Sequence, residues 1–262
     1  MTGDLPSDPQ YSHCAIAVMA KASIRGHAKT RLVPPLTPDE AASLNTAFLR
    51  DITDNLIVVS ASANIAPYMA YAPAGSAAFF REVLPARVGL LETVAPTLGE
   101  CLWQAATGLI DAGHEAACLL NSDSPTLPVA YLVAAATALA VPGDRMVLGP
   151  STDGGYYLIG LKRPHRRLFE DIDWSTERVA DQTLARAREL NLAVHQLPSW
   201  YDVDDLQALR LLAGELFEDR RFRVWGSKPT PAAWTRRELV RMLAGTDLAE
   251  RLGVAVPASL VA

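Results

Sequence analysis

The alternation of apolar and polar segments predicts strands and helices that follow one another along most of the chain. Short apolar runs predict buried strands, and longer segments that open with capping residues predict helices. We expect strands at 13–19, 65–72, 88–94, 116–120, 146–148, 156–161 and 192–197, and helices at 37–56, 75–84, 98–112, 128–140, 175–191, 202–215 and 236–244. This alternation predicts an α/β fold with a single doubly wound, mostly parallel sheet.

Two local signals in this pattern have a clear physical basis. Thr37-Pro38-Asp39-Glu40 is typical of a helix start, with Thr37 as N-cap, Pro38 in the first turn and Glu40 closing a capping box. The apolar run 116–120 is too short for a helix and is flanked by polar residues. We therefore interpret it as a central parallel strand, and expect ligand-binding residues directly after it.

The composition changes after about Asp219, where Arg, Trp and Pro residues become mixed and one further helix follows. We therefore divide the chain into a main domain at 12–219 and a C-terminal helical appendage at 220–262. The appendage could be a lid, a contact in a homodimer, or a segment that packs against the sheet. The sequence does not choose among these.

The composition is that of a globular protein and narrows the classes of partner. Of 262 residues, 50% are hydrophobic and 20% are charged, with a formal net charge of -5. No broad basic region indicates nucleic-acid binding. The three cysteines form no CxxC pair, and the apolar run 129–141 is too short to span a bilayer. With no signal peptide at the acidic N-terminus, we expect a cytoplasmic protein that is not inserted in a membrane.

A basic loop follows the first predicted strand and is the first candidate site. Arg25, Lys29 and Arg31 lie within seven residues together with the flexible Gly26. Neighbouring cations repel one another unless an anion lies between them, and Arg and Lys suit a phosphate chain. A solvated loop that is basic by chance remains the alternative. The loop has no Walker motif.

Acidic residues follow two later elements. Asp123, between Ser122 and Ser124, comes just after the run 116–120 and could hold Mg²⁺ or Mn²⁺, although an Asp before a helix is often only a cap. Asp202 and Asp204 alternate, so an extended chain would point both side chains one way. A second metal ligand is then plausible, but acids ahead of a helix also need no function.

A glycine-containing turn precedes the strand predicted at 156–161. Asp153 projects from this turn, and Gly154 and Gly155 would let the backbone approach a ligand closely. A plain hairpin turn explains the Asp-Gly pair equally well.

Several of these segments together resemble a known family. They are Ala28-Lys29-Thr30-Arg31-Leu32, Asp123-Ser124-Pro125-Thr126-Leu127-Pro128, residues 149–161, Trp174-Ser175-Thr176, and Asp202-Val203-Asp204 followed by Leu206. In this order they resemble a bacterial family classified as glycosyltransferases of the A-type nucleotide-diphospho-sugar transferase fold, formerly a domain of unknown function. The chain is more distantly similar to guanylyltransferases that activate phospholactate or phosphoenolpyruvate. The resemblance spans about residues 14–212.

The resemblance implies a set of site residues. It implies that nucleotide phosphates bind Arg25, Gly26, Lys29, Arg31 and Ser122, that Asp123 and Asp204 ligate Mg²⁺ or Mn²⁺, and that Asp153, Gly154, Gly155, Tyr156 and Trp174 line an acceptor or sugar pocket. Lys29, Asp123 and Asp153 are then the expected catalytic residues. The chain departs from the family at Asn121, where we expect Gly, and at Cys101-Leu102, where relatives tend to have Arg-Met.

Two reactions are compatible with these residues, together with a non-catalytic alternative. The sequence favours nucleotidylyl transfer from a nucleoside triphosphate to a phosphorylated acceptor, because three cations suit a triphosphate and a leaving pyrophosphate. The second is glycosyl transfer from a nucleotide-sugar to a small-molecule acceptor, with Asp153 as base if the enzyme inverts. The third hypothesis is a nucleotide-binding or regulatory module without catalysis, which the retained acids disfavour.

Overall fold

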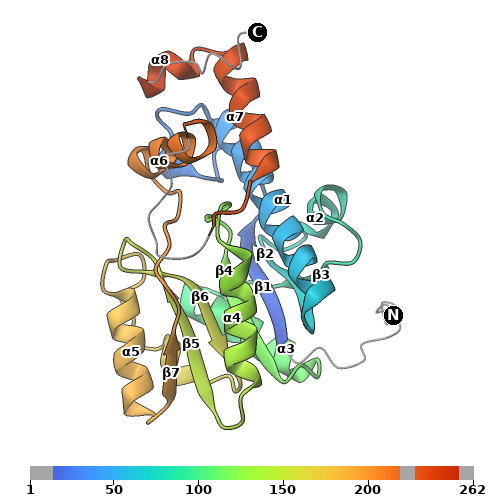
Figure 1. The fold of residues 1–262 in the computed structure, drawn as a ribbon, viewed down its shortest axis with the longest axis vertical. Coiled ribbons are helices and arrows are strands. Elements are labelled where there is room, and N and C mark those ends of the chain that lie inside the picture. The colour runs from blue at the N-terminus through green and yellow to red at the C-terminus, as the bar shows by residue number, and fades with distance from the viewer. Residues whose placement is uncertain (1–13, 219–227, 254–262) are drawn as a thin grey trace.

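Strands of small and apolar residues form one sheet at the centre of the molecule (Figure 1). The structure is a computed structural model, and it describes residues 14–218 and 228–253. The sheet has seven strands in the order β3-β2-β1-β4-β6-β5-β7. Their bounds are β1 Cys14–Lys21, β2 Ile65–Ala72, β3 Gly89–Glu92, β4 Ala116–Asn121, β5 Arg145–Pro150, β6 Tyr156–Leu161 and β7 Ala193–Gln196.

The sheet is mostly parallel, as the sequence predicts. β1 pairs in parallel with β2 and β4, β2 with β3, and β5 with β7. β6 is antiparallel to both β4 and β5, so it alone runs in the opposite direction. The run 116–120 is therefore a central strand with one parallel and one antiparallel neighbour. Since six strands share a direction, their carboxyl ends lie along one edge, and the β5–β6 turn lies there too.

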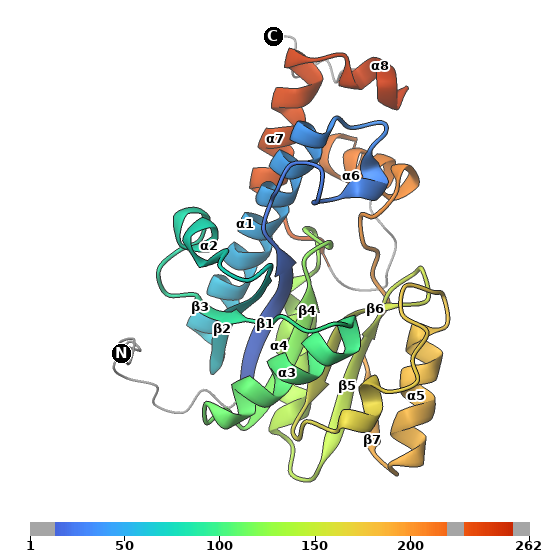
Figure 2. The same ribbon diagram turned by 180° about the vertical axis from the view of Figure 1, so that it is seen from behind.

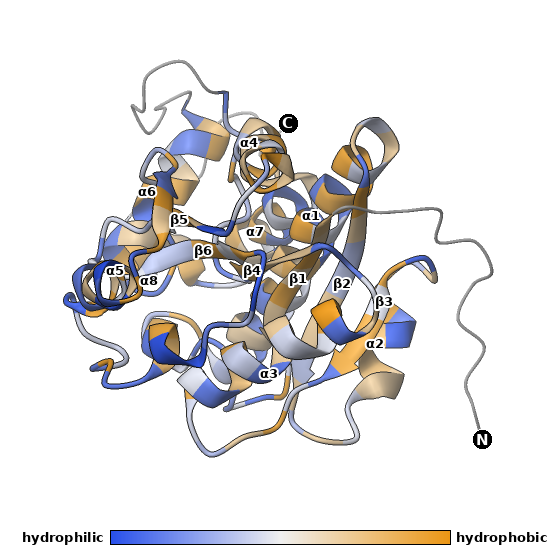
Figure 3. Cartoon of the chain, turned by 90° about the horizontal axis from the view of Figure 1, so that it is seen from below, coloured by the Kyte–Doolittle hydropathy of each residue, from blue (hydrophilic) through white to orange (hydrophobic). Residues whose placement is uncertain are grey.

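Helices cover both faces of the sheet (Figures 1 and 2). The helices are α1 Pro38–Ser62, α2 Ala77–Val83, α3 Leu98–Asp111, α4 Val129–Ala140, α5 Val179–Glu189, α6 Leu206–Phe217, α7 Ala233–Gly245 and α8 Leu248–Leu252, with short 3-10 helices at Thr30–Leu32 and Arg166–Phe169. Alternate residues of β1 enter different cores: Ile16 packs with α1 and α4, whereas Ala17 packs with α3. Figure 3 shows the hydrophobic strands between these two layers.

The start of α1 is confirmed and its end differs from the prediction. The Thr37 hydroxyl accepts from the Glu40 amide at 3.2 Å, and the Thr37 amide donates to the Glu40 carboxylate at 2.7 Å. The helix continues past Leu56 to Ser62, because Val59 extends its buried face.

Two helices start four residues later than the sequence suggests. The helix expected from Ser175 begins at Val179, because the Thr176 hydroxyl donates to the Asp173 carbonyl and accepts from the Arg178 amide, which stabilises a turn instead. The helix expected from Asp202 begins at Leu206, where Asp205 is the N-cap. Residues 202–204 consequently lie before the helix and not within it.

The C-terminal helical extension packs on the main body. Helix α7 lies beside α1, and its residues Leu239 and Met242 are buried in the same core as the α1 residues. Asp51 of α1 accepts hydrogen bonds from the first amides of α7, those of Trp234 and Thr235. The proposed boundary at 219/220 lies outside the described residues. No helix in the described ranges has the length and apolarity to cross a membrane.

Candidate functional site

Three charged side chains from distant segments meet at the carboxyl edge of the sheet. Lys29 follows β1, Asp123 follows β4, and Asp204 precedes α6. The Lys29 Nζ atom lies 2.7 Å from Oδ1 of Asp123 and 3.2 Å from Oδ1 of Asp204. The strand-end positions explain this convergence, since loops that leave parallel strands at one edge share the space beyond it.

The Lys29 ammonium is buried and pairs with these carboxylates. Only 5% of the Lys29 side chain is exposed, and Nζ also donates to the Val203 carbonyl at 2.8 Å. An ammonium has three donors, so each has a protein acceptor. The backbone of Lys29 has φ 49° and ψ 40°, a left-handed conformation that costs a non-glycine residue energy and persists only where the surroundings fix it. Lys29 thus acts as an internal counter-ion.

The two carboxylates are also fixed through their backbones. The Val203 amide donates to the Asp123 carbonyl at 2.9 Å, and the Ser124 hydroxyl donates to the Tyr201 carbonyl at 2.9 Å. Residues 202–204 therefore run beside the loop that carries Asp123. Asp202 and Asp204 both line the cavity described below.

Further acids lie close to this centre. Burial, and then the charge of Asp153, raise the pKa of Asp202 to about 6, although a hydrogen bond from Ser151 at 2.8 Å opposes the shift. Burial and the neighbouring Asp123 raise the pKa of Asp204, and Lys29 opposes this. The region therefore carries more negative charge than its own cations neutralise.

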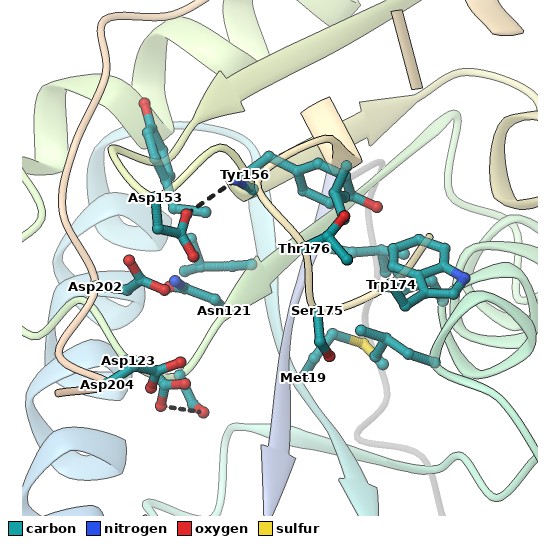
Figure 4. A pocket seen from close by; sticks show the side chains of 18 of the residues that line it. Met19, Asn121, Asp123, Asp153, Tyr156, Trp174, Ser175, Thr176, Asp202 and Asp204 are labelled. Atoms are coloured by element: carbon teal, nitrogen blue, oxygen red, sulfur yellow. Dashed lines mark hydrogen bonds between the residues drawn. The ribbon is translucent and has the colours of Figure 1, made fainter. Parts of the chain in front are cut away.

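A two-lobed cavity opens at these residues. One lobe, of about 350 Å³, lies over β4 and β6, and we call it the β4–β6 lobe (Figure 4). The other, of about 420 Å³, lies over the ends of β1 and β2, and we call it the β1–β2 lobe. The residues lining both lobes are Met19, Arg31, Leu98, Ser122, Asp123, Ser175 and Asp204. Asp123, Asp204 and Arg31 thus lie between two compartments, each large enough for part of a ligand.

The lobes differ in chemistry. Asp153, Glu177 and Asp202 line the β4–β6 lobe together with the aromatic rings of Tyr156 and Trp174. In Figure 4, Asp153 and Asp202 lie on the side opposite Trp174. Lys21, His27, Lys29, Asn45 and Thr93 are among the residues lining the β1–β2 lobe. Apart from the residues that line both lobes, the first compartment is acidic and aromatic, and the second contains basic side chains.

The basic loop is only partly directed at the cavity. The Arg31 guanidinium lies 3.6 Å from Asp204, and 65% of its side chain is exposed. Arg25 instead pairs with Asp39 at 3.1 Å, and neither Arg25 nor Gly26 lines either lobe. Of the phosphate-binding residues expected from the sequence, the structure therefore brings Lys29, Arg31 and Ser122 to the cavity.

The turn that carries Asp153 is both a hairpin and a wall of the cavity. It joins the antiparallel strands β5 and β6, and the Gly155 amide donates to Asp153 at 2.9 Å. Gly154 does not line the cavity. With φ 91°, it leaves no room for a side chain, because a Cβ would lie 2.1 Å from the Glu177 carbonyl oxygen. Gly154 therefore lets the 174–177 segment, another wall of the lobe, pack against the turn.

Some lining residues had no role in the sequence-based prediction. Met19 is at the carboxyl end of β1, a position that could have indicated it. Asn45 is a polar residue on the buried face of α1, and its amide donates to Lys21 and Ser23. Ser175 and Glu177 could not be identified, because the sequence suggested a helix there.

The acids fit a divalent cation that also has water or phosphate ligands. Among the described residues, no group of three or more His, Cys, Asp or Glu side chains could hold a metal ion. Mg²⁺ typically uses one or two protein carboxylates and completes its shell with water and substrate phosphates. Asp123 and Asp204 both pair with the Lys29 ammonium, so they lie close enough to supply the two carboxylates of such a site.

Comparisons with known proteins agree with this fold. Residues 55–176 match the model of a family described as "Uncharacterized protein conserved in bacteria (DUF2064)". A solved structure described as a putative nucleotide-diphospho-sugar transferase from Desulfovibrio desulfuricans G20 is 28% identical, covers 87% of this chain and 95% of its own, and has a TM-score of 0.73. The resemblance stated from the sequence is thereby confirmed.

A more distant structure shares the fold. The 4-diphosphocytidyl-2C-methyl-D-erythritol synthase of Anaerococcus prevotii DSM 20548 is 10% identical, covers 79% of this chain and 99% of its own, and has a TM-score of 0.50. No curated protein matches the sequence.

Proposed function

We propose that this chain is a metal-dependent transferase that moves a glycosyl group from a nucleotide-diphosphate sugar to a small-molecule acceptor. The observation that carries the proposal is that two of the three cations of the basic loop are already paired with acidic side chains of the protein. Lys29 neutralises Asp123 and Asp204, and Arg25 pairs with Asp39. This reverses the order favoured by the sequence, which counted all three cations of the loop toward a triphosphate.

The charges support a diphosphate in the middle of the cavity. The Arg31 guanidinium is exposed between the lobes and can donate two parallel hydrogen bonds to a phosphate. Asp123 and Asp204 would hold Mg²⁺ or Mn²⁺, which when bound offsets the charge of the departing diphosphate. The nucleoside then occupies the β1–β2 lobe, and the sugar and acceptor occupy the β4–β6 lobe.

The acidic lobe suits hydroxyl groups better than a second phosphate. Asp153 and Asp202 accept hydrogen bonds, and aromatic faces such as Trp174 pack against apolar sugar faces. In the transfer, the bond between the anomeric carbon and the diphosphate breaks, and a bond to the acceptor oxygen forms. If the acceptor oxygen attacks from the face opposite the diphosphate, this single displacement inverts the anomeric carbon, and Asp153 accepts the proton of the acceptor hydroxyl.

Nucleotidylyl transfer is the second candidate, and one observation favours it. Lys21 and His27 line the β1–β2 lobe with Arg31, so further basic groups are present where a triphosphate could extend. A triphosphate carries about four negative charges and needs such groups. The fold shared with the 4-diphosphocytidyl-2C-methyl-D-erythritol synthase is compatible with either reaction.

The test is a product analysis with a matched variant. The protein is incubated with nucleotide-sugars or nucleoside triphosphates, with Mn²⁺ or with chelator, and the products are identified by mass. We expect slow Mn²⁺-dependent release of nucleoside diphosphate from one nucleotide-sugar, and loss of this release in Asp123→Ala, which should stay folded although Lys29 loses one of its partners. Pyrophosphate release from a triphosphate would support the second candidate. A nucleotide affinity that changes neither with Mn²⁺ nor in Asp123→Ala would indicate a non-catalytic module.

A further inference from the structure

Thr230 connects the C-terminal extension to the loop that carries Asp123. Its amide donates to the Thr126 carbonyl at 3.0 Å. Its hydroxyl lies 3.0 Å from the Pro125 carbonyl and 3.3 Å from the Leu127 carbonyl, and accepts from the Asn55 amide at 3.1 Å. Only 9% of Thr230 is exposed. One residue thus satisfies carbonyls from a short stretch of irregular backbone.

The loop needs such partners, because it has few of its own. It leaves β4 and reaches α4 through residues 122–128, and its two prolines lack amide donors. On one side, the Thr126 hydroxyl bonds to the Tyr201 hydroxyl at 3.1 Å. On the other side lies Thr230. Buried carbonyls without partners are costly, so these two contacts help to hold the loop in place, together with the bonds of Asp123 and Ser124 described above.

The same extension also contacts the basic loop. Arg251 of α8 donates to the Pro35 carbonyl, and it pairs with Glu40 at 2.7 Å. Pro35 follows the 3-10 helix that contains Arg31, and Glu40 belongs to the first turn of α1. The extension therefore bonds to both segments that bring Lys29 and Asp123 together.

We infer that Thr230 is a positioning residue, whose hydroxyl holds the loop so that Asp123 faces Lys29 and Asp204. The C-terminal extension then stabilises the loop of the candidate metal site, and this is the role that we assign to it. The effect of Thr230 on metal binding rests on the proposed function, which makes Asp123 a metal ligand. The effect of Thr230 on the position of the loop does not depend on that function.

The experiment compares two substitutions at Thr230 with one control. Thr230→Val removes the hydroxyl at nearly constant volume, and Thr230→Ser keeps it. Thr53→Val is the control, because Thr53 is fully buried in α1 and its hydroxyl has no hydrogen-bond partner among the described residues. Thr53→Val thus makes the same chemical change without breaking a bond.

Two readouts are measured on the full chain. The first is hydrogen exchange at the Val203 amide without metal, since this amide donates to the Asp123 carbonyl. The second is the affinity for Mn²⁺ alone, measured by water-proton relaxation. For Thr230→Val we expect faster exchange at Val203 and about three- to tenfold weaker Mn²⁺ binding, the range expected for losing one hydrogen bond. Thr230→Ser and Thr53→Val should match the unmodified protein.

The outcomes separate this inference from the proposed function. If Thr230→Val lowers thermal stability but leaves exchange at Val203 unchanged, Thr230 is a structural residue only. If Thr230→Ser behaves like Thr230→Val, the hydroxyl is not responsible. If Asp123→Ala binds Mn²⁺ as the unmodified protein does, the metal assignment fails, and the exchange rates still decide the role of Thr230.

Discussion

Lys29 Nζ and Asp123 Oδ1 lie 2.7 Å apart, although the two residues belong to loops that follow different strands. The same ammonium also lies 3.2 Å from Asp204. A cation that the sequence assigned to nucleotide phosphates is thus paired with the two candidate metal ligands. This relationship changes what each nearby substitution is expected to do.

Replacing Lys29 should affect stability as well as activity. Lys29→Met removes the cation shared by Asp123 and Asp204, so the metal-free protein should lose about 1–3 kcal/mol of unfolding free energy. Mn²⁺ should raise the melting temperature more in Lys29→Met than in the unmodified protein, because the metal replaces the lost charge. Urea denaturation and thermal shift measure both effects. An unchanged unfolding free energy would mean that the ammonium contributes nothing to the fold.

Arg31 and Arg25 form a matched pair for the nucleotide site. Both belong to the basic loop, but only Arg31 lines the cavity. Arg31→Ala should raise the KM for the nucleotide substrate about tenfold or more, the cost of losing a charge-assisted hydrogen bond. Arg25→Ala should leave this KM unchanged. Equal effects from the two substitutions would contradict the assignment of Arg31.

Gly154 and Gly26 have similar backbone angles in different surroundings. Both have positive φ, but an added Cβ at Gly26 meets no atom of the described residues within 4 Å, whereas at Gly154 it meets the backbone of Glu177. Gly26→Ala should cost about 1 kcal/mol for its backbone conformation alone. Gly154→Ala should cost about 2–4 kcal/mol, because the segment at Glu177 must also move. Chemical denaturation of the two variants gives the comparison, and similar costs would argue against tight packing at the turn.

The Glu40 carboxylate should make stability depend on pH at the acid end. Burial acts to raise its pKa, but hydrogen bonds from Arg251, the Thr37 amide and Thr246 outweigh burial and hold the pKa at about 2. A pKa below the unfolded value of 4.5 means that the contribution is present above pH 4.5 and is lost as the pH falls toward 2.

The matching variant is Glu40→Gln. It should be less stable than the unmodified protein by about 2 kcal/mol at pH 7, and the difference should shrink as the pH falls through this window. Urea midpoints measured from pH 7 to pH 3 test this. A difference that stays constant with pH would show that the charge of Glu40 is not the stabilising feature.

The sequence predicted features that depend on neighbouring residues or on strand ends. The capping box of Thr37 and Glu40 is local, and Asp123 was found because it follows a short apolar strand. The position of Arg25 depends on its pairing with Asp39, and sequence spacing does not show which way a loop side chain turns. The direction of β6 was detectable, since five residues between β5 and β6 are too few for a parallel crossover.

The Lys29 ammonium also bears on how the protein is supplied with metal. Because a side chain of the chain itself balances Asp123 and Asp204, the folded state can form before any ion arrives. Under the proposed function, the folded protein would then exist without metal, and binding of an ion would change its activity rather than its folding.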